Sequence, residues 1–345
     1  MPSVAENLAL LDRIYRGQAA GPAFLVQPPF KPLYEPPGDY TLSDRPVTDW
    51  VPDIVEHYAT QVRWLEALDD DTVPVAHLNT GTHLYAAAFG CPVHEYEDTN
   101  PAALPIATCA AEAEAVPEPD LWTCRGLVRV FELGHAVQAE LGEDVWLGPP
   151  DIQTGFDTAA LIWDKSDFYA ALIAEPAAVH RLVGKCARLL SSFLAELRRE
   201  FPRMVPAHCP RLWAPPDLGW WVSNDECGAF GTQVFREFCL PEMVELSERF
   251  GSFGMHCCAD AEHQFPALSE IPNFYAFNRV AGRRGWDTLL PAFQGPDAPV
   301  HVLGWLDPAL IAHLRSQAAE GTRFIFVHGA MDLEDGRRWL AEVRG

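Results

Sequence analysis

The sequence predicts an α/β fold of the (β/α)8 (TIM) barrel class with an N-terminal helical and proline-rich extension. From residue 73 onward, short apolar runs alternate with long helical patterns, which is typical of βα units and a parallel sheet. The segment 73–345 is close in length to the roughly 250 residues of such a barrel. No G-x-G-x-x-G motif follows the first predicted strand, which disfavours an open, doubly wound sheet.

Residues 1–72 are expected to form the extension and 73–345 the barrel. The extension begins with a helix near 4–17 and ends with the amphipathic pattern "DIVEHYATQVRWLEALDD". Between them lies "QPPFKPLYEPPGDY", whose proline density prevents regular structure through residues 28–37. We expect this part to pack on the barrel as a lid or wrapping arm.

Seven apolar segments are expected to be strands: 73–80, 144–153, 218–225, 252–258, 273–278, 299–305 and 322–329. Helical patterns lie between them, notably at 122–142, 176–200, 232–250, 307–320 and 332–343. An eighth strand is expected within 88–96 or 205–214, which would complete the barrel.

The amino-acid composition restricts the classes of molecule that the protein is expected to bind. The chain has 25 lysines and arginines against 48 aspartates and glutamates, a formal net charge of -23, which disfavours nucleic acid and anionic membranes. Nine scattered cysteines, an N-terminal pattern that reads as an amphipathic helix, and the lack of an apolar run long enough for a membrane span predict a soluble cytoplasmic protein with reduced thiols.

Polar residues gather where the predicted strands end, which is the active face of a barrel. They are Asn79, Gln153, Asn224, Asp225, Glu226, His256, Cys258, Asn278, Trp305, Asp307 and His328.

The stretch "GMHCCADAEHQF" predicts a metal site. In a strand, His256 and Cys258 share one face while Cys257 takes the apolar face, and zinc accepts imidazole and thiolate together. His328 ends the last strand and is expected to be the third ligand, leaving one coordination position open. The plainer interpretation is a buried histidine beside inert thiols, with His328 as a helix cap.

The remaining strand-end residues are expected to serve chemistry and binding. Asp225 or Glu226 is expected to be a fourth metal ligand or a general acid for the leaving group. The residues Gln153, Asn278, Asn79 and Trp305 are expected to contact a small substrate, with turn and core roles as the alternative.

Three stretches of the chain resemble the uroporphyrinogen decarboxylase superfamily. "FREFCLPEMVELSERFGSFGMHCCAD" combines a helix containing F-x-x-F-x-x-P with a strand ending in H-x-C. The supporting stretches are "LNTGTHLYAAAFGCPVHEYEDTNPAALP" and "DIQTGFDTAALIWDKSDFYAALIAEPAAVHRLVGKCARLL". The resemblance covers most of residues 73–345 and implies a single barrel with its site at the strand C-terminal mouth.

Within that superfamily, the chain is more similar to the zinc- and corrinoid-dependent methyltransferases than to the true decarboxylases. The decarboxylases carry an arginine-rich N-terminal segment that holds carboxylates, and this chain has "AFLVQPPFKPLYEPP" at about that place. In the methyltransferases, H-x-C and a later cysteine bind zinc. His256 and Cys258 match the first part, and His328 stands where the later cysteine would fall.

The resemblance therefore implies a zinc-dependent methyltransferase that moves a methyl group between a small substrate and a corrinoid (cobalamin) carried by a small partner protein. A site with two histidines and one cysteine is a stronger Lewis acid than a site with two thiolates. It therefore favours the demethylating direction, in which the metal polarises the heteroatom of a methylated substrate. The alternatives are a metal-independent decarboxylase of a small carboxylated substrate and a non-catalytic, ligand-binding barrel.

Overall fold

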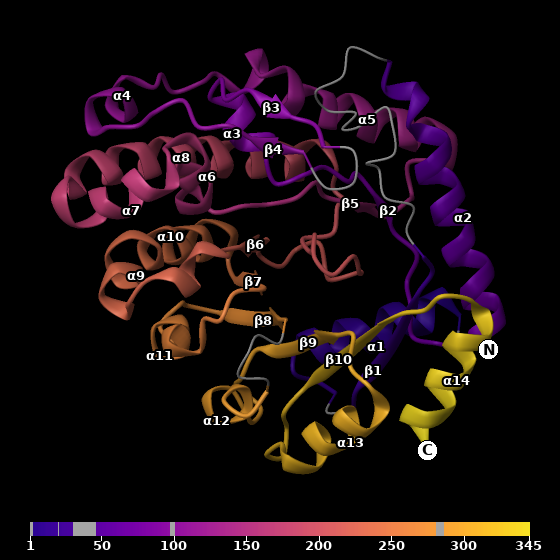
Figure 1. Cartoon of the computed structure of the whole chain (residues 1–345). Coiled ribbons are helices and arrows are strands. Elements are labelled where there is room, and N and C mark those ends of the chain that lie inside the picture. Colours follow the sequence, from indigo (N-terminus) through magenta and orange to yellow (C-terminus); the bar gives the residue numbers. More distant parts are fainter. Residues whose placement is uncertain (1–2, 20, 30–45, 97–100, 281–285) are drawn as a thin grey trace.

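The computed structural model describes residues 3–19, 21–29, 46–96, 101–280 and 286–345 (Figure 1). Its centre is a six-stranded parallel sheet in the order β1-β10-β9-β8-β7-β6. These strands span β1 Ala23–Gln27, β6 Trp221–Ser223, β7 Phe253–Cys257, β8 Phe274–Arg279, β9 Val300–Gly304 and β10 Phe324–Gly329. The fold is therefore α/β with a parallel central sheet.

The remaining described strands form two smaller sheets. β2 (Ala76–His77) pairs with β5 (Leu147–Gly148) in parallel, and β3 (Val93–His94) pairs with β4 (Ala102–Ala103) antiparallel. Isolated parallel bridges link Gln153 to Ser223 and Leu147 to Met204. Among the described strands the continuous eight-stranded ring of a closed barrel is not formed, so this part of the prediction is not supported.

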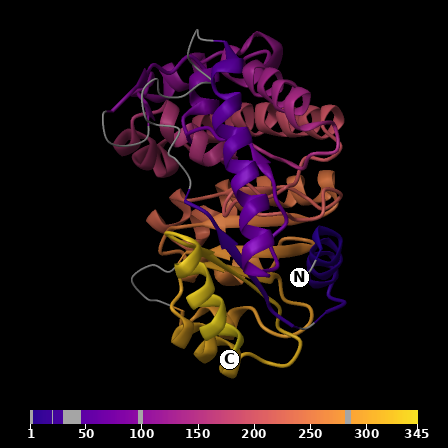
Figure 2. The same ribbon diagram turned by 90° about the vertical axis from the view of Figure 1, so that its right-hand side faces the viewer.

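The helices lie mostly on the outer side of the strands, whereas α1 packs on the opposite side (Figure 1). They are α1 Val4–Tyr15, α2 Val51–Leu68, α3 Leu84–Ala88, α4 Ala110–Ala115, α5 Arg125–Leu141, α6 Gly155–Ile162, α7 Lys165–Ala174, α8 Pro176–Glu200, α9 Thr232–Phe238, α10 Leu240–Phe250, α11 Phe265–Leu268, α12 Leu289–Ala292, α13 Pro308–Gln317 and α14 Leu333–Arg344. Short 3-10 helices span Val47–Asp49, Leu121–Thr123, Glu226–Ala229 and Glu262–Gln264. Figure 2 shows α2 running lengthwise along one side of the molecule, from the upper helical part to the end near α14.

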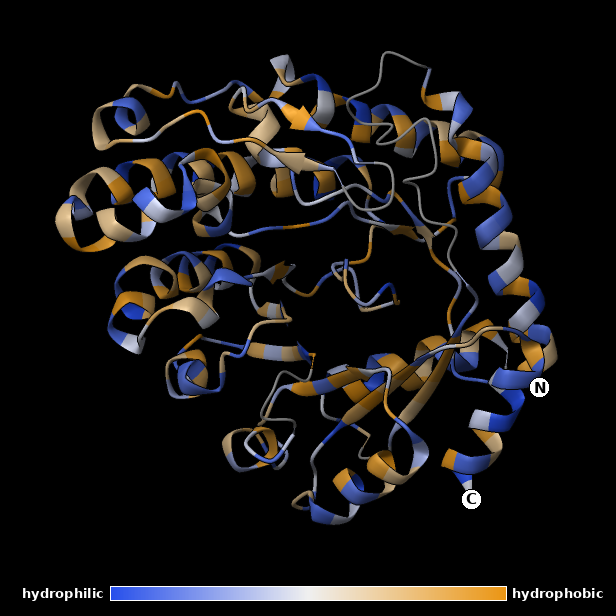
Figure 3. Ribbon diagram, viewed as in Figure 1, coloured by the Kyte–Doolittle hydropathy of each residue, from blue (hydrophilic) through white to orange (hydrophobic). Residues whose placement is uncertain are grey.

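The strands separate two apolar clusters. One face packs against the outer helices, and its strand residues are Phe24, Val26, Phe253, Met255, Cys257, Phe277, Leu303, Phe324 and Phe326. The opposite face packs against α1, and its strand residues are Ala23, Leu25, Trp221, Ala276, Val300, Val302, Ile325 and Val327. We call them the helix-facing side and the inner side. Figure 3 shows the apolar character of β9 and β10, as expected for strands buried on both faces.

The seven predicted strands are all present, although β2 and β5 are shorter than expected. The central sheet also contains β1, which lies in the segment 1–72 that we assigned to an extension. Residues 88–96 hold only β3, outside the central sheet, and 205–214 hold no strand. The predicted helix 232–250 is present as α9 and α10, and Pro241 occupies the first turn of α10. Most of the proline-rich stretch lies outside the described residues.

Across the described part of the chain, no helix combines the length and the apolar character that a membrane span requires.

Candidate metal centre

Three potential metal ligands meet at the ends of β6 and β7. The ligand atoms of Asp225, His256 and Cys258 all lie within 4.8 Å of one another. His256 is buried, whereas Cys258 is exposed and Asp225 half-buried, so the group opens toward solvent on one side. Of the residues predicted for the metal, the structure thus brings His256 and Cys258 together, and it adds the acid that the sequence placed beside them.

Asn278 on β8 fixes the orientation of the His256 ring. The amide Nδ2 of Asn278 donates to the carbonyl of Val302 at 2.6 Å, so its Oδ1 is the acceptor for His256 Nδ1, also at 2.6 Å. His256 Nδ1 therefore carries the proton, and Nε2 is the nitrogen left for the neighbouring groups. Asn278 was predicted to contact substrate, but it is fully buried and holds the histidine instead.

Cys209 is a further sulfur at this site that the sequence analysis did not include. It lies in the segment between α8 and β6, close enough to His256 to raise the pKa of its imidazole. Cys209 is not part of the group of three mutually close ligands, and its effect on the site is the one on His256. The donors around His256 are therefore two thiols and one carboxylate.

These sulfurs and Asp225 set the electrostatics of His256. Burial lowers the pKa of the imidazole, but Cys209, Cys258 and Asp225 together outweigh burial and raise the pKa well above its usual value. The pKa of Cys258 lies above its usual value, because burial and the charge of Asp225 outweigh the lowering effect of His256. The groups around His256 thus stabilise a positive charge, as the surroundings of a bound cation must also do.

Asp225 is positioned by two backbone hydrogen bonds. Its Oδ1 accepts from the backbone N–H of Cys258 at 2.9 Å, and its own N–H donates to Asp157 Oδ2 at 2.7 Å. Asn224, which is fully buried, also donates to Asp157 Oδ1 at 2.9 Å. Burial raises the pKa of Asp157 well above its usual value, and the charge of Asp225 adds to this shift. Asp157 and Asn224 thus support the turn that presents Asp225.

Glu226 belongs to a different set of contacts. Its carboxylate accepts hydrogen bonds from Lys165 Nζ, at 2.6 Å, and from the hydroxyl of Tyr169. It is not part of the group formed by Asp225, His256 and Cys258. Of the two acids predicted for catalysis, Asp225 is the one beside His256 and Cys258.

His328, the predicted third ligand, does not reach the site. Its ring stacks on Trp339 of α14, with centroids 4.9 Å apart, and its Nε2 lies 3.2 Å from Asp335 Oδ2. His328 shares a strand face with Phe326, and Phe326 packs on the helix-facing side. His256 alternates with Met255 and Cys257, which pack on that same side, so its own ring points to the inner side. The prediction placed His328 on the wrong side of the sheet.

The other predicted substrate contacts divide into two groups. Gln153 is buried and donates to Asp151 Oδ1 at 2.8 Å, close to Ser223 of β6, while Asn79 follows β2 and has a buried amide Nδ2 without a partner. Trp305 is 67% exposed and follows β9 with a positive φ of 58°. Asp307 caps α13 by accepting from the N–H of Leu310.

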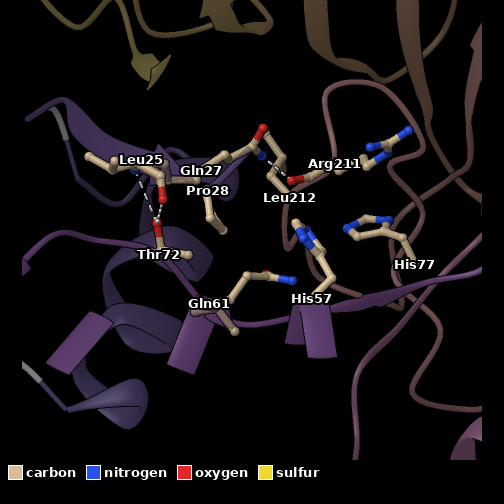
Figure 4. Close-up of a pocket in the computed structure, with 11 residues that line it drawn as sticks. Leu25, Gln27, Pro28, His57, Gln61, Thr72, His77, Arg211 and Leu212 are labelled. Carbon is tan, nitrogen blue, oxygen red and sulfur yellow. Dashed lines mark hydrogen bonds between the residues drawn. The ribbon is translucent and has the colours of Figure 1, made fainter. Parts of the chain in front are cut away.

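A small cavity lies between β1, β2 and the segment that carries Cys209 (Figure 4). It is lined by Leu25, Val26, Gln27, Pro28, His57, Gln61, Thr72, Val73, His77, Arg211 and Leu212. Burial, with a contribution from the charge of Arg211, lowers the pKa of His57 to about 4 and that of His77 well below its usual value. The polar part of the lining therefore includes two neutral imidazoles and one guanidinium, beside several apolar side chains.

Cys209 and the residues of this cavity were not predicted from the sequence. One signal was available, because 205–214 was a candidate for the eighth strand and its polar residues were not counted among the strand ends. Residues His208, Cys209 and Arg211 all lie in that segment.

No protein-family model matches the sequence, and no curated protein matches it either. Among solved structures, the chain is similar to a methyltransferase from Methanosarcina mazei with a TM-score of 0.62, covering 100% of this chain and 99% of the other at 12% sequence identity. At that identity the similarity shows a shared fold along the whole chain.

Proposed function

We propose that the chain is a zinc-dependent methyltransferase that uses His256, Cys258 and Cys209 as metal ligands and moves a methyl group between a small substrate and a corrinoid on a separate protein. The observation that carries the proposal is the meeting of imidazole, carboxylate and sulfur donors at the ends of β6 and β7. The neighbour of the same fold is named a methyltransferase, which supports this class of reaction.

The residues present fit a zinc ion. Zinc takes imidazole nitrogen at about 2.0 Å and thiolate sulfur at about 2.3 Å, so neighbouring ligands of a tetrahedral site lie about 3.5 to 3.8 Å apart. The ligand atoms of His256 and Cys258 lie within 4.8 Å of each other, so small side-chain movements would bring them to one ion. Cys209 is not part of the group of three mutually close ligands, so its thiol would have to move further. The hydrogen bond from His256 Nδ1 to Asn278 leaves Nε2 as the nitrogen that would bind the ion, as partners of ligating histidines commonly do.

The donor set changes the direction we favour. When bound, a zinc ion would lower the pKa of a substrate thiol so that the thiolate is present near neutral pH. Two sulfur donors make the site more electron-rich than the two-histidine set expected from the sequence. We therefore favour methylation of a thiol over the demethylating direction.

The chain's own residues have separate roles in this proposal. Asp225 Oδ1 is occupied by the N–H of Cys258, so Oδ2 remains to take the proton that a substrate thiol releases. Asn278 keeps the ring of His256 in one tautomer. The exposed side of the group, at Cys258, is where a corrinoid on a partner protein would approach.

The test is metal analysis of the purified full chain, followed by X-ray absorption and a transfer assay. We expect about one zinc per chain with sulfur and nitrogen neighbours, and transfer from methylcobalamin to a small thiol. Both properties should be lost in Cys258→Ser. A zinc-free protein that keeps its transfer activity would contradict the proposal, and a decarboxylase would keep its activity after chelation.

A further inference from the structure

Another cavity, with a volume of about 400 Å³, lies between α1, α2 and the segments that lead into β2 and β5. We call it the α1–α2 cavity. Val4 and Leu8 line it from α1, and Tyr58, Val62 and Leu65 line it from α2. Spacings of three and four residues place these side chains on one face of each helix. Small-molecule sites measure about 300 to 1,000 Å³, so the cavity has the size of a ligand site.

The α1–α2 cavity lies at the other end of the strands from the candidate metal centre. Pro74 and Trp146, which also line the cavity, precede the first residues of β2 and β5. The parallel bridge between Gln153 and Ser223 shows that the chain through β5 runs in the same direction as β6. The candidate metal centre lies at the ends of β6 and β7, so a ligand in the α1–α2 cavity occupies a separate site.

Arg203 brings a positive charge to the lining of the cavity, and its hydrogen-bonding capacity is unused. Its guanidinium stacks on Trp146, 3.9 Å from the ring centroid, which leaves the N–H groups at the edge of the guanidinium available. Among the residues that the structure describes, its Nε has no partner, although it is buried, and its ionic contact with Asp144 is 3.8 Å, longer than a hydrogen bond. A buried N–H group without a partner costs free energy that a bound acceptor would restore.

Two acids and one phenol complete the polar lining. The side chain of Asp144 is fully exposed, so its ion pair with Arg203 is weak in water, and Glu66 is exposed as well. These two carboxylates would repel a dianion more strongly than a monoanion. Burial raises the pKa of Tyr58, against the charge of Arg203, so its hydroxyl keeps its proton and serves as a second donor.

We propose that the α1–α2 cavity binds an amphipathic monocarboxylate, whose carboxylate accepts hydrogen bonds from Arg203 and Tyr58 and whose apolar body packs between the two helices. A guanidinium binds a carboxylate through two parallel hydrogen bonds, and Nε with one terminal nitrogen of Arg203 provides them. An aliphatic chain would bury apolar surface against Leu8, Val62 and Leu65, and the affinity should rise with the area buried. This site depends on neither zinc nor methyl transfer.

The first experiment measures the binding of octanoate to the purified full chain by calorimetry. We expect about one octanoate per chain. Arg203→Gln should weaken binding by about tenfold or more, and Arg203→Lys should recover only part of the affinity, because lysine keeps the charge but not the paired donors. Arg63→Gln, which removes an exposed arginine of α2 outside the cavity, is the matched control and should bind as the wild type does. Wild-type affinity in Arg203→Gln, or no binding to the wild type, would overturn the inference.

The chemistry of the ligand is tested with three further molecules. Octanol has no charge and acetate has no apolar body, so each should bind about tenfold or more weakly than octanoate. Octyl phosphate has close to two negative charges at neutral pH and should also bind more weakly, because of the two acids in the lining. Equal affinities for octanol and octanoate would exclude the role of Arg203, and tighter binding of octyl phosphate would overturn the assignment to a monocarboxylate.

A second variant keeps the test decisive if the loss of Arg203 disturbs the fold. Val4 is 40% exposed, so Val4→Trp is expected to fill the cavity from its open side while the buried core stays as it is. This variant should lose octanoate binding and keep the thermal unfolding midpoint, zinc content and methyl transfer of the wild type. Unchanged octanoate binding in Val4→Trp would place the ligand outside the cavity and overturn the inference. A protein without zinc that still binds octanoate through Arg203 would refute the proposed function alone.

Discussion

His256 on β7 and His328 on β10 both lie at the carboxyl ends of parallel strands, yet they face opposite sides of the sheet. His256 points to the inner side, where Asn278 holds its Nδ1 and two sulfurs and a carboxylate surround it. His328 points to the helix-facing side, where it stacks on Trp339 and pairs with Asp335. The two histidines share a residue type and a position in their strands, but of the two only His256 belongs to a group of three potential metal ligands among the described residues.

The same division holds for two other histidines. His77 on β2 lines the cavity, whereas His301 on β9 is bound to the carbonyl of Phe293 at 2.7 Å and stacks on Phe324. Histidines on the helix-facing side have structural partners, and those on the inner side face one another or the cavity. The side of the strand, more than its end, therefore decides whether a histidine lies beside potential ligands or beside structural partners.

The largest effect that tests this comparison is the loss of metal. His256→Ala should bring the zinc content of the purified protein close to zero and abolish methyl transfer, because it removes the central ligand. His328→Ala is the matched control and should keep a full zinc content by elemental analysis. Loss of zinc from the His328 variant, with an unchanged fold by circular dichroism, would contradict the division between the two sides.

Removal of the sulfur that the sequence analysis missed should have the next largest effect. Cys209→Ser should weaken zinc binding by more than about 100-fold in competition with a chelator, because serine is a poor ligand for zinc. The control is Cys227→Ser, since Cys227 is buried on the helix-facing side and donates to the carbonyl of Asn224, a bond that serine keeps. Equal zinc affinities of the two variants would exclude Cys209 as a ligand.

The stability of the protein should depend on pH through His301, which lies on the helix-facing side. Burial lowers the pKa of His301 to about 4, so below about pH 6.5 the unfolded chain binds a proton that the folded chain refuses. The free energy of unfolding therefore falls as the pH drops through this window. Between about pH 7 and about pH 5, the wild type should lose roughly 2 kcal/mol more than His301→Gln, which does not titrate there.

Urea unfolding at the two pH values measures this difference. An identical loss in wild type and variant would mean that His301 is protonated in the folded state, contrary to its burial.

A smaller effect is expected for the residue that orients His256. Asn278→Ala should weaken zinc binding by about 10- to 100-fold, as is usual for groups that orient a metal ligand. Asn278→Asp keeps an oxygen acceptor for His256 Nδ1 and should recover part of the affinity. Chelator competition distinguishes the two variants, and an Asn278→Ala protein with wild-type affinity would show that the ring needs no support from β8.

Features that depend on residues close together in the sequence were predicted, whereas features that depend on residues far apart in the sequence were missed. The seven strands were predicted because apolar runs are a local signal, and His256 with Cys258 was predicted because alternation in a strand is local too. β1 was missed since its five residues stand between a helix and a proline-rich stretch, and its partner β10 is at the far end of the chain. Cys209 was missed because it lies in a segment with no strand of its own.

The error with His328 has a different origin. Its strand face was assigned correctly relative to Phe326, but which face turns to the helices follows from packing with α14 and cannot be read from β10 alone. On β7 an apolar strand face also turns to the helices. Comparing β10 with β7 is therefore what shows that the face with Phe326 and His328 lies on the helix-facing side.

The pairing of β1 with β10 also constrains how the protein is made. Arg323 beside β10 donates to the carbonyls of Ile14 and Tyr15 in α1, a contact between Arg323 and Ile14 that joins residues 309 positions apart. On the ribosome, β1 must therefore wait for the synthesis of β10 before this edge of the strand is covered. Pairing over so large a sequence separation is a non-local contact, which tends to form late in folding.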